Sequence, residues 1–480
     1  MKKTLWAILV LGFVCRLLYL GGRQLDTDEL LLATAVRGDS AAALLNRFGT
    51  GALFPVPLNV LAQKLSVILL GESNWALRFP SVLFSTLSLW VLFRAATYLF
   101  GERVALCTTA LLAILPLHYH FSQEAGPGSL FFLLSLVSYD CLLRNAAGSQ
   151  AGWISRLGLA VALTLLFYTS PLAAFVVASQ FICLLFAPAI TDWNKGECTS
   201  AQPPGGDASH RLRMLAVYTS CVLASLALFY PWARFAWVPG RLASLPHLPS
   251  WRFLYRGIKE LGDNSYPATL ILLIGACIGF YALRRHKQFQ RLRWLLVWLF
   301  SLVPMPLLCD SMVRSHLSTT CLIPLSAPLV LLAGYGVSFV GERLTILDEP
   351  PIQVSAPAIA YLVLSAAVST FIAHRHWQRV EVDWAGAASY LKTKLSPGDE
   401  LTVPIGASLL EYYEPIELYR MGRLDPGSGK SVDRPGIRRA VVCADGARPD
   451  PCRAFRKAAG NDPAWSRLEL RGLTVFERPK

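Results

Sequence analysis

The chain has 480 residues, of which 54% are hydrophobic and only 16% are charged, and its mean hydropathy is +0.44. These values exclude an ordinary soluble domain and indicate a helical protein that crosses a membrane many times. The net charge of +14 does not indicate nucleic-acid binding, because the basic residues are spread between apolar runs. Such a distribution is typical of topology signals and of contacts to lipid phosphates.

The first apolar run, residues 4–20, follows Met-Lys-Lys and so looks like a signal peptide, but no small-residue cleavage site comes after it. We therefore interpret it as an uncleaved first helix. An acidic triplet, Asp26, Asp28 and Glu29, follows directly. Its carboxylates are expected at a membrane face, where an enzyme that acts on a lipid-linked substrate needs them.

Apolar runs along the chain predict an all-α polytopic protein with about eleven spans, several of them shorter than the roughly 20 residues that a perpendicular helix needs. Residues 57–70 are the doubtful case, and their polarity favours a juxtamembrane helix in the interface. The polar residues of that helix are Asn59, Gln63, Lys64 and Ser66. The predicted spans are residues 4–20, 79–98, 104–119, 128–143, 156–168, 171–188, 212–231, 266–283, 292–309, 318–340 and 354–373.

The distribution of basic residues predicts the orientation of these spans. The segment RRHKQFQRLR at 284–293 contains no acidic residue and is expected in the cytoplasm by the positive-inside rule. An odd number of spans then places the amino terminus in the cytoplasm and the acidic triplet, Arg78, residues 118–128 and the carboxy-terminal tail outside. The basic external loop at 231–265 argues against this orientation, although long loops follow the rule less strictly.

From residue 375 onward the pattern changes. Short apolar runs at 400–405, 440–444 and 473–477 alternate with polar stretches, and residues 384–395 have a helical pattern. We therefore predict a membrane domain over 1–374 and a small extracytoplasmic α/β domain over 375–480. Its two cysteines, Cys443 and Cys452, either form a disulfide in an oxidising compartment or remain free thiols.

An ordered set of short motifs resembles the GT-C glycosyltransferases of the protein-O-mannosyltransferase and aminoarabinose-transferase type. This type is similar to glycosyltransferase family 39. The resemblance is strongest over residues 20–145. Each motif alone is weak, whereas their order is fairly specific. The motifs are Asp28-Glu29, Pro57-Leu58, GESNWALRFPS at 71–81, FGER at 100–103 and SQEA at 122–125.

The resemblance implies a multi-pass plasma (inner) membrane enzyme. Such an enzyme moves a sugar, with inversion, from a polyprenyl-phosphate carrier to a lipid, glycan or protein acceptor on the outer face. It implies that Asp28 is the general base, because an alcohol is a poor nucleophile until its proton is being removed. Glu29 is then expected to orient the acceptor or to support the loop. The departing phosphate requires cations, for which Arg78 is the leading candidate, and Arg314 and His316 are weaker ones.

The chain also departs from this family. Gln123 and Glu124 match the motif and are expected to bind substrate, but Gly126-Pro127-Gly128 replaces an Arg and a Tyr that relatives commonly carry. Pro55-Val56 stands where the aminoarabinose branch has Glu-Lys, which argues against aminoarabinose transfer in particular.

Two further questions remain open at the level of the sequence. A divalent metal held by His118, His120 and Glu124 is one interpretation of that cluster, and a wet interfacial cluster without a metal is the other. A transporter or flippase of a lipid-linked sugar is the alternative function. It predicts charges near the middle of the membrane and an internal repeat, and neither is evident in the sequence.

Overall fold

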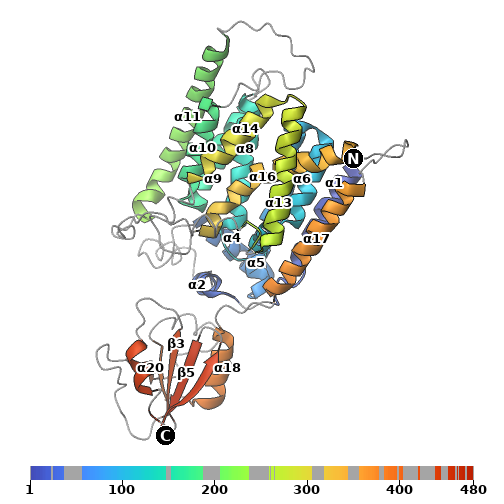
Figure 1. Ribbon diagram of the computed structural model, residues 1–480. Coiled ribbons are helices and arrows are strands. Elements are labelled where there is room, and N and C mark those ends of the chain that lie inside the picture. Colours follow the sequence, from blue (N-terminus) through green and yellow to red (C-terminus); the bar gives the residue numbers. More distant parts are fainter. Residues whose placement is uncertain are drawn as a thin grey trace. The chain divides into compact units, whose positions relative to one another are not determined.

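The computed structural model shows a helical membrane part and a mixed α/β part (Figure 1). It describes residues 2–22, 25–36, 57–146, 153–186, 206–236, 259, 261–263, 265–304, 318–343, 356–377, 383–396, 399–403, 420–421, 438–444, 452–459, 462, 464–470 and 473–478. The chain divides into two compact units. The first comprises Met1–Leu20, Ala41–Gly71 and Trp75–His376, and the second comprises Gly21–Ser40, Glu72–Asn74 and Trp377–Lys480.

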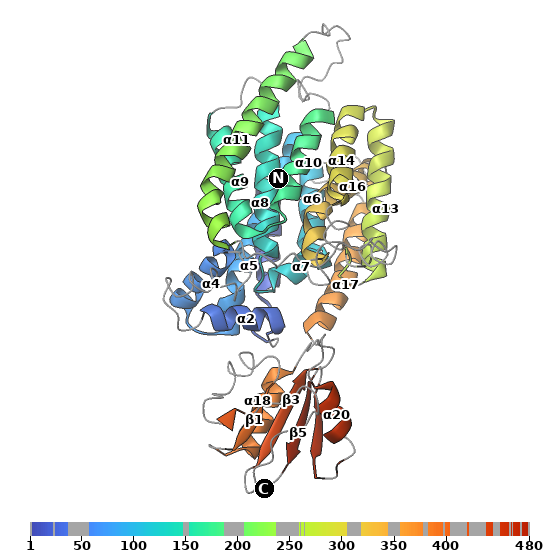
Figure 2. The same cartoon turned by 90° about the vertical axis from the view of Figure 1, so that its left-hand side faces the viewer.

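The helices of the first unit form a bundle in which most long helices run side by side (Figures 1 and 2). Every predicted span contains one of these helices. They are α1 (Lys2–Leu17), α4 (Pro57–Leu70), α5 (Asn74–Phe100), α6 (Glu102–Ile114), α7 (Pro116–Ser122), α8 (Gly128–Ala146), α9 (Trp153–Thr169), α10 (Ala173–Phe186), α11 (Gly206–Ala236), α13 (Tyr266–Arg285), α14 (Phe289–Leu302), α16 (Ser318–Arg343) and α17 (Ala356–Trp377).

Within the described residues, five helices are long and apolar enough to cross a membrane, and the bent pair α6 and α7 makes a sixth if it counts as one span. The protein is therefore a polytopic membrane protein. The five segments are Asn74–Phe100, Gly128–Ala146, Arg211–Arg234, Tyr266–Arg285 and Leu322–Val340.

The segment expected as one span over 104–119 is not one straight helix. It bends by 60° between α6 and α7. Leu115 has an extended backbone (φ −68°, ψ 122°) and Pro116 begins α7. Proline lacks the N–H of a helical hydrogen bond and disfavours the α conformation of the residue before it, so the break lies at this pair.

Close packing between α13 and α16 depends on glycines. Gly279 lies directly against the backbone of Leu332, and Gly275 lies against the backbone of Gly336. On the opposite side of α16, two residues from Leu332 and from Gly336, Gly334 packs on Thr108 of α6. Small residues at such positions let membrane helices approach closely, and dispersion then stabilises the contact.

The second unit contains α2 (Thr27–Val36) and a five-stranded sheet of order β2-β1-β3-β5-β4. Three of its strands overlap the runs for which strands were predicted. The central strand β3 (Arg439–Ala444) pairs in parallel with β1 (Glu400–Thr402) and antiparallel with β5 (Leu473–Arg478). The edge strands are β2 (Arg420–Met421), parallel to β1, and β4 (Ser466–Leu470), antiparallel to β5.

Helices α18 (Trp384–Lys394) and α20 (Arg453–Ala459) contact different side chains of β5. Phe476 packs edge to face on Phe455 of α20, with ring centroids 5.3 Å apart. Its neighbour Glu477 accepts a hydrogen bond of 2.6 Å from the hydroxyl of Tyr390 in α18. Successive side chains of a strand point to opposite faces, so the two helices cover the two faces of the sheet (Figure 2).

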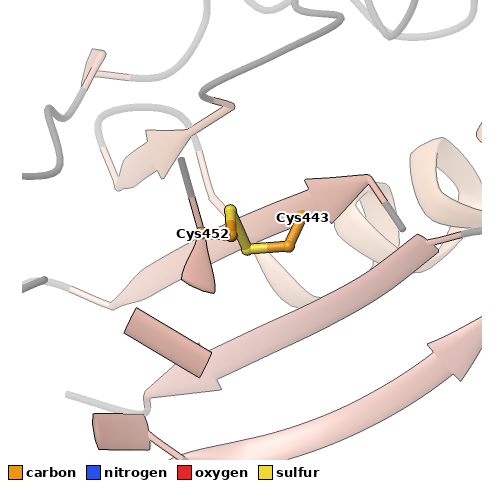
Figure 3. The surroundings of a disulfide bond; sticks show 2 residues. All are labelled: Cys443 and Cys452. Atoms are coloured by element: carbon orange, nitrogen blue, oxygen red, sulfur yellow. A yellow bond between two sulfur atoms is a disulfide. The ribbon is translucent and has the colours of Figure 1, made fainter. Parts of the chain in front are cut away.

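The two cysteines of this unit form a disulfide (Figure 3). It joins Cys443 at the end of β3 to Cys452, which precedes α20, and their Cα atoms are 5.9 Å apart. Both residues belong to the buried core of the sheet, together with Val441, Phe455 and Phe476.

We expect Cys452→Ser to destabilise this unit by about 2–3 kcal/mol, because the closed loop no longer restricts the unfolded chain. Thermal unfolding of the full chain with and without reductant measures this change. The exposed free cysteine Cys277 provides a matched control, Cys277→Ser, that should leave the transition unchanged. A transition that is insensitive both to reductant and to Cys452→Ser would contradict the prediction.

Candidate active site

The acidic triplet begins α2 and forms a capping box. The backbone N–H of Leu30 donates to the carbonyl of Asp26, which makes Asp26 the residue that caps the helix. The carboxylate of Asp26 accepts from the N–H of Glu29 at 2.8 Å, and Glu29 Oε2 accepts from the N–H of Asp26 at 3.1 Å. This reciprocal pair satisfies two backbone donors that the first helical turn leaves free.

The carboxylate of Glu29 thus binds the backbone of the segment that carries Asp28. Its carboxylate is almost fully buried, at 1% exposure. Asp28 lies between the two capping residues in the first turn of α2, and its side chain lies outside the described part of the chain. The amino-terminal end of a helix favours the ionised form of a carboxylate, and this is the form that a general base needs.

The carboxyl end of α1, which precedes the acidic triplet, is capped by side chains from α5 and α7. A helix end leaves several carbonyl groups without a helical partner. Here four carbonyl groups in and just after the last turn of α1 accept from Tyr119, Gln123 and Arg78. The bonds run from Tyr119 Oη to Cys15 O (3.1 Å), from Gln123 Nε2 to Arg16 O (3.2 Å) and Leu18 O (2.7 Å), and from Arg78 Nη1 to Leu20 O (2.9 Å).

A buried polar cluster surrounds the side chain of Arg16, in the last turns of α1. Arg16 is fully buried and donates from Nε to Ser85 Oγ (2.8 Å) and from Nη1 to Gly12 O (2.8 Å), and its Nη2 lies 3.0 Å from His118 Nδ1. All three partners are neutral acceptors. Because Arg16 of α1 binds Ser85 of α5 and His118 of α7, the cluster fixes these three helices against one another. A charged residue inside an apolar span is rare, so Arg16 was a signal that sequence analysis passed over.

A second cluster links α7 to the turn before α13. The ring of His120 has a carboxylate beside each nitrogen: Nε2 lies 3.5 Å from Glu124 Oε2 and Nδ1 lies 3.4 Å from Asp263 Oδ1. His120 and Glu124 are each about one fifth exposed, so this pair can meet a ligand.

His118, His120 and Glu124, for which a metal was one of two interpretations, do not come together as one set of metal ligands. His118 turns its Nδ1 towards the cation Arg16, while His120 lies between the carboxylates of Glu124 and Asp263. Within the described ranges, no group of three His, Cys, Asp or Glu side chains is arranged to hold a metal ion. The described side chains at this place therefore do not fit a metal ion.

The structure thus places the predicted site residues in three groups. Gln123 and Arg78 cap α1, Glu124 pairs with His120, and Glu29 caps α2. Arg314 and His316 lie outside the described residues. Within the described residues, the cap on α1 brings together Gln123 and Arg78, which belong to different sequence motifs.

Comparisons with known proteins decide the fold. A family model described as dolichyl-phosphate-mannose-protein mannosyltransferase matches residues 55–200. ArnT from Cupriavidus metallidurans in the apo state superposes with a TM-score of 0.62 at 14% identity, covering 99% of this chain and 98% of ArnT. The chain has the GT-C fold. This result confirms the resemblance that the ordered motifs predicted.

Two further structures share the GT-C fold. The oligosaccharyltransferase of Archaeoglobus fulgidus in its apo form has a TM-score of 0.54 at 10% identity, covering 87% of this chain and 64% of its own. The arabinofuranosyltransferase AftD from Mycobacteria has a TM-score of 0.53 at 15% identity, covering 99% of this chain and 41% of its own. No curated protein sequence matches the chain.

Proposed function

We propose that this protein is a glycosyltransferase that moves a sugar from a polyprenyl-phosphate carrier to an acceptor at the outer face of the plasma membrane. The observation that carries the proposal is similarity over the whole length to ArnT, which has also been solved with bound undecaprenyl phosphate. That structure superposes with a TM-score of 0.58 at 14% identity and covers 98% of this chain and 97% of its own. The family model matches the part of the chain that contains four of the five motifs.

In the proposed reaction, Asp28 accepts the proton of the acceptor hydroxyl as that oxygen attacks the anomeric carbon. The bond between the anomeric carbon and the phosphate oxygen breaks, and its electron pair stays on the carrier phosphate. Attack from the side opposite the phosphate inverts the anomeric configuration. Glu29 holds the first turn of α2 in place through its bond to the Asp26 N–H, so that Asp28 is presented at a helix end.

Gln123 and Arg78 act in this proposal as positioning residues. Both are buried and donate to the backbone of the α1 end, from which the chain leads directly to the acidic triplet. The partly exposed pair of His120 and Glu124 is better placed to meet substrate, because each of these side chains is about one fifth accessible to solvent.

We expect Gln123→Leu to lower kcat by about tenfold and to leave the donor KM unchanged. The substitution removes the hydrogen bonds to Arg16 O and Leu18 O, and it thereby loosens the segment that leads to the base. Steady-state kinetics with a labelled donor measure both constants. A raised KM with an unchanged kcat would show instead that Gln123 binds substrate directly.

The disulfide supports an external position for the carboxy-terminal unit, because such bonds persist in oxidising compartments and are rare in the cytosol. This orientation agrees with the positive-inside assignment of residues 284–293. Fusion of alkaline phosphatase to the carboxy terminus should give an active phosphatase, and fusion of a reporter that works only in the cytoplasm should give none. The reverse pattern would place this end in the cytoplasm and contradict the proposed orientation.

The function itself is tested by incubating membranes that contain the protein with radiolabelled polyprenyl-phosphate hexoses and pentoses. We expect label to move from one of these carriers into lipid, glycan or protein, and the fraction that receives it identifies the acceptor class. Label that stays on every carrier would contradict the proposed function.

A further inference from the structure

Helix α4 turns its polar side chains inward and its apolar side chains outward. Asn59 and Gln63 are buried, at 1% and 0% exposure, whereas Leu65, Ile68 and Leu69 are more than half exposed. The sequence predicted a juxtamembrane helix in the interface and gave no direction for these side chains. The apolar outer face suits lipid contact, but the inward polar face needs partners inside the protein.

Within the described part of the chain, the two carboxamides on this inward face have no hydrogen-bond partner. Nδ2 and Oδ1 of Asn59 and Nε2 and Oε1 of Gln63 are buried there and make no hydrogen bond. Their spacing of four places both on one side of the helix. On the next turn, Ser66 is satisfied, because its hydroxyl donates to the carbonyl of Ala76 at 2.5 Å. Buried polar groups are nearly always paired, so a pair of wholly unsatisfied carboxamides calls for a missing partner.

The chemistry of a carboxamide selects the kind of partner. Each carboxamide offers two N–H donors and a carbonyl acceptor. A phosphate accepts hydrogen bonds only and would leave both carbonyl groups unpaired, and a hydrocarbon chain would leave all four atoms unpaired. A hydroxyl group both donates and accepts, so adjacent hydroxyls of a sugar match the two side chains.

We propose that Asn59 and Gln63 form a subsite for the hydroxyl groups of a sugar. This inference rests on the proposed function, under which both the donor and a glycan acceptor supply such hydroxyls. The carboxamides are covered in the structure, so binding requires α4 to turn or to move outward. The unsatisfied groups reduce the cost of this movement, since they gain partners when they are uncovered.

A stability measurement tests whether the two carboxamides are unsatisfied in the unbound protein. Asn59→Leu and Gln63→Met replace each carboxamide by an apolar side chain of similar size. We expect both variants to keep or raise the Tm of the purified protein, because each removes an unsatisfied polar group. Gln180→Met is the matched control. Gln180 is equally buried, but it donates to Ser138 at 2.6 Å and accepts from Tyr218 at 3.1 Å, so its replacement should lower the Tm.

A binding measurement tests whether the two side chains bind the hydroxyl groups of a sugar. The probes are polyprenyl phosphate, polyprenyl-phosphate mannose and polyprenyl-phosphate arabinose, compared by native mass spectrometry. If the donor sugar occupies the subsite, the wild-type protein prefers a sugar-bearing carrier over the bare carrier. Asn59→Leu and Gln63→Met then lose about tenfold of that preference with unchanged binding of the bare carrier. If the acceptor occupies it, donor preference is retained and the acceptor KM rises about tenfold.

Two results would overturn the subsite. One is a lowered Tm in Asn59→Leu and Gln63→Met like that of Gln180→Met, which would mean that buried water ties these carboxamides to the fold. The other is unchanged donor preference together with an unchanged acceptor KM in both variants. Failure of the proposed function is seen separately, since it appears in the wild-type protein as transfer from none of the carriers.

Discussion

Asp28→Asn is expected to lower sugar transfer by about 10²- to 10⁴-fold, which is the usual contribution of a general base. An asparagine side chain has nearly the same shape as the aspartate but takes up no proton from the acceptor hydroxyl. The capping box on either side of it consists of Asp26 and Glu29 and does not involve the side chain at position 28. The variant should therefore insert, fold and bind the donor as the wild-type protein does. Initial rates with a labelled donor and a binding isotherm for that donor measure the two properties.

The neighbouring variant Asp26→Asn is the matched control. It removes one carboxylate from the same triplet but keeps a side chain that caps helices about as well as aspartate. Its transfer rate should stay within a few-fold of the wild-type rate. Equal losses in both variants would mean that the triplet acts only through its negative charge or its structure, and the assignment of Asp28 as the base would be wrong.

Gly279→Ala is expected to disrupt the membrane bundle. A Cβ atom at this position would overlap the backbone carbonyl of Leu332, and backbone cannot move aside as a flexible side chain does. Helices α13 and α16 would have to separate, with a loss of about 3 kcal/mol or more from strain and lost packing. We expect a much lower yield of monodisperse protein in detergent and a large fall in Tm, both measured by fluorescence-detected gel filtration after heating.

Gly158→Ala is the control for this substitution. Gly158 lies in α9, and an added Cβ atom would meet only the sulfur of Cys141 at 3.2 Å, a side chain that can shift slightly. Alanine also favours the helix over glycine by about 0.5–1 kcal/mol. The variant should therefore behave as the wild-type protein does. A Gly279→Ala variant of similar stability would show that α13 and α16 do not need the close approach seen in the structure.

The sequence predicted the helices well, because a long apolar run is recognised from consecutive residues without knowledge of distant contacts. It also identified the acidic triplet, whose spacing of Asp26 and Glu29 is that of a capping box. The bend at Pro116 was available from the same information, since a proline inside a predicted span breaks a helix at the residue before it.

Other features depended on contacts between distant residues. Gln123 lies within a sequence motif, but its hydrogen bonds to the end of α1 join residues more than a hundred positions apart. The inward direction of Asn59 and Gln63 was not predicted, because composition gives the polarity of a helix and not the side on which its neighbours pack. The disulfide remained open for a similar reason, since pairing requires the Cα distance that the sheet and α20 set.

Direct displacement with Asp28 as the base can be tested with purified protein in lipid vesicles and a polyprenyl-phosphate sugar that carries label in the sugar only. We expect the wild-type protein to move the label to an acceptor hydroxyl with an inverted anomeric configuration, and Asp28→Asn to move almost none. Transfer with a retained configuration, or equal transfer by the two proteins, would contradict the claim that Asp28 removes the acceptor proton during direct displacement of the carrier phosphate.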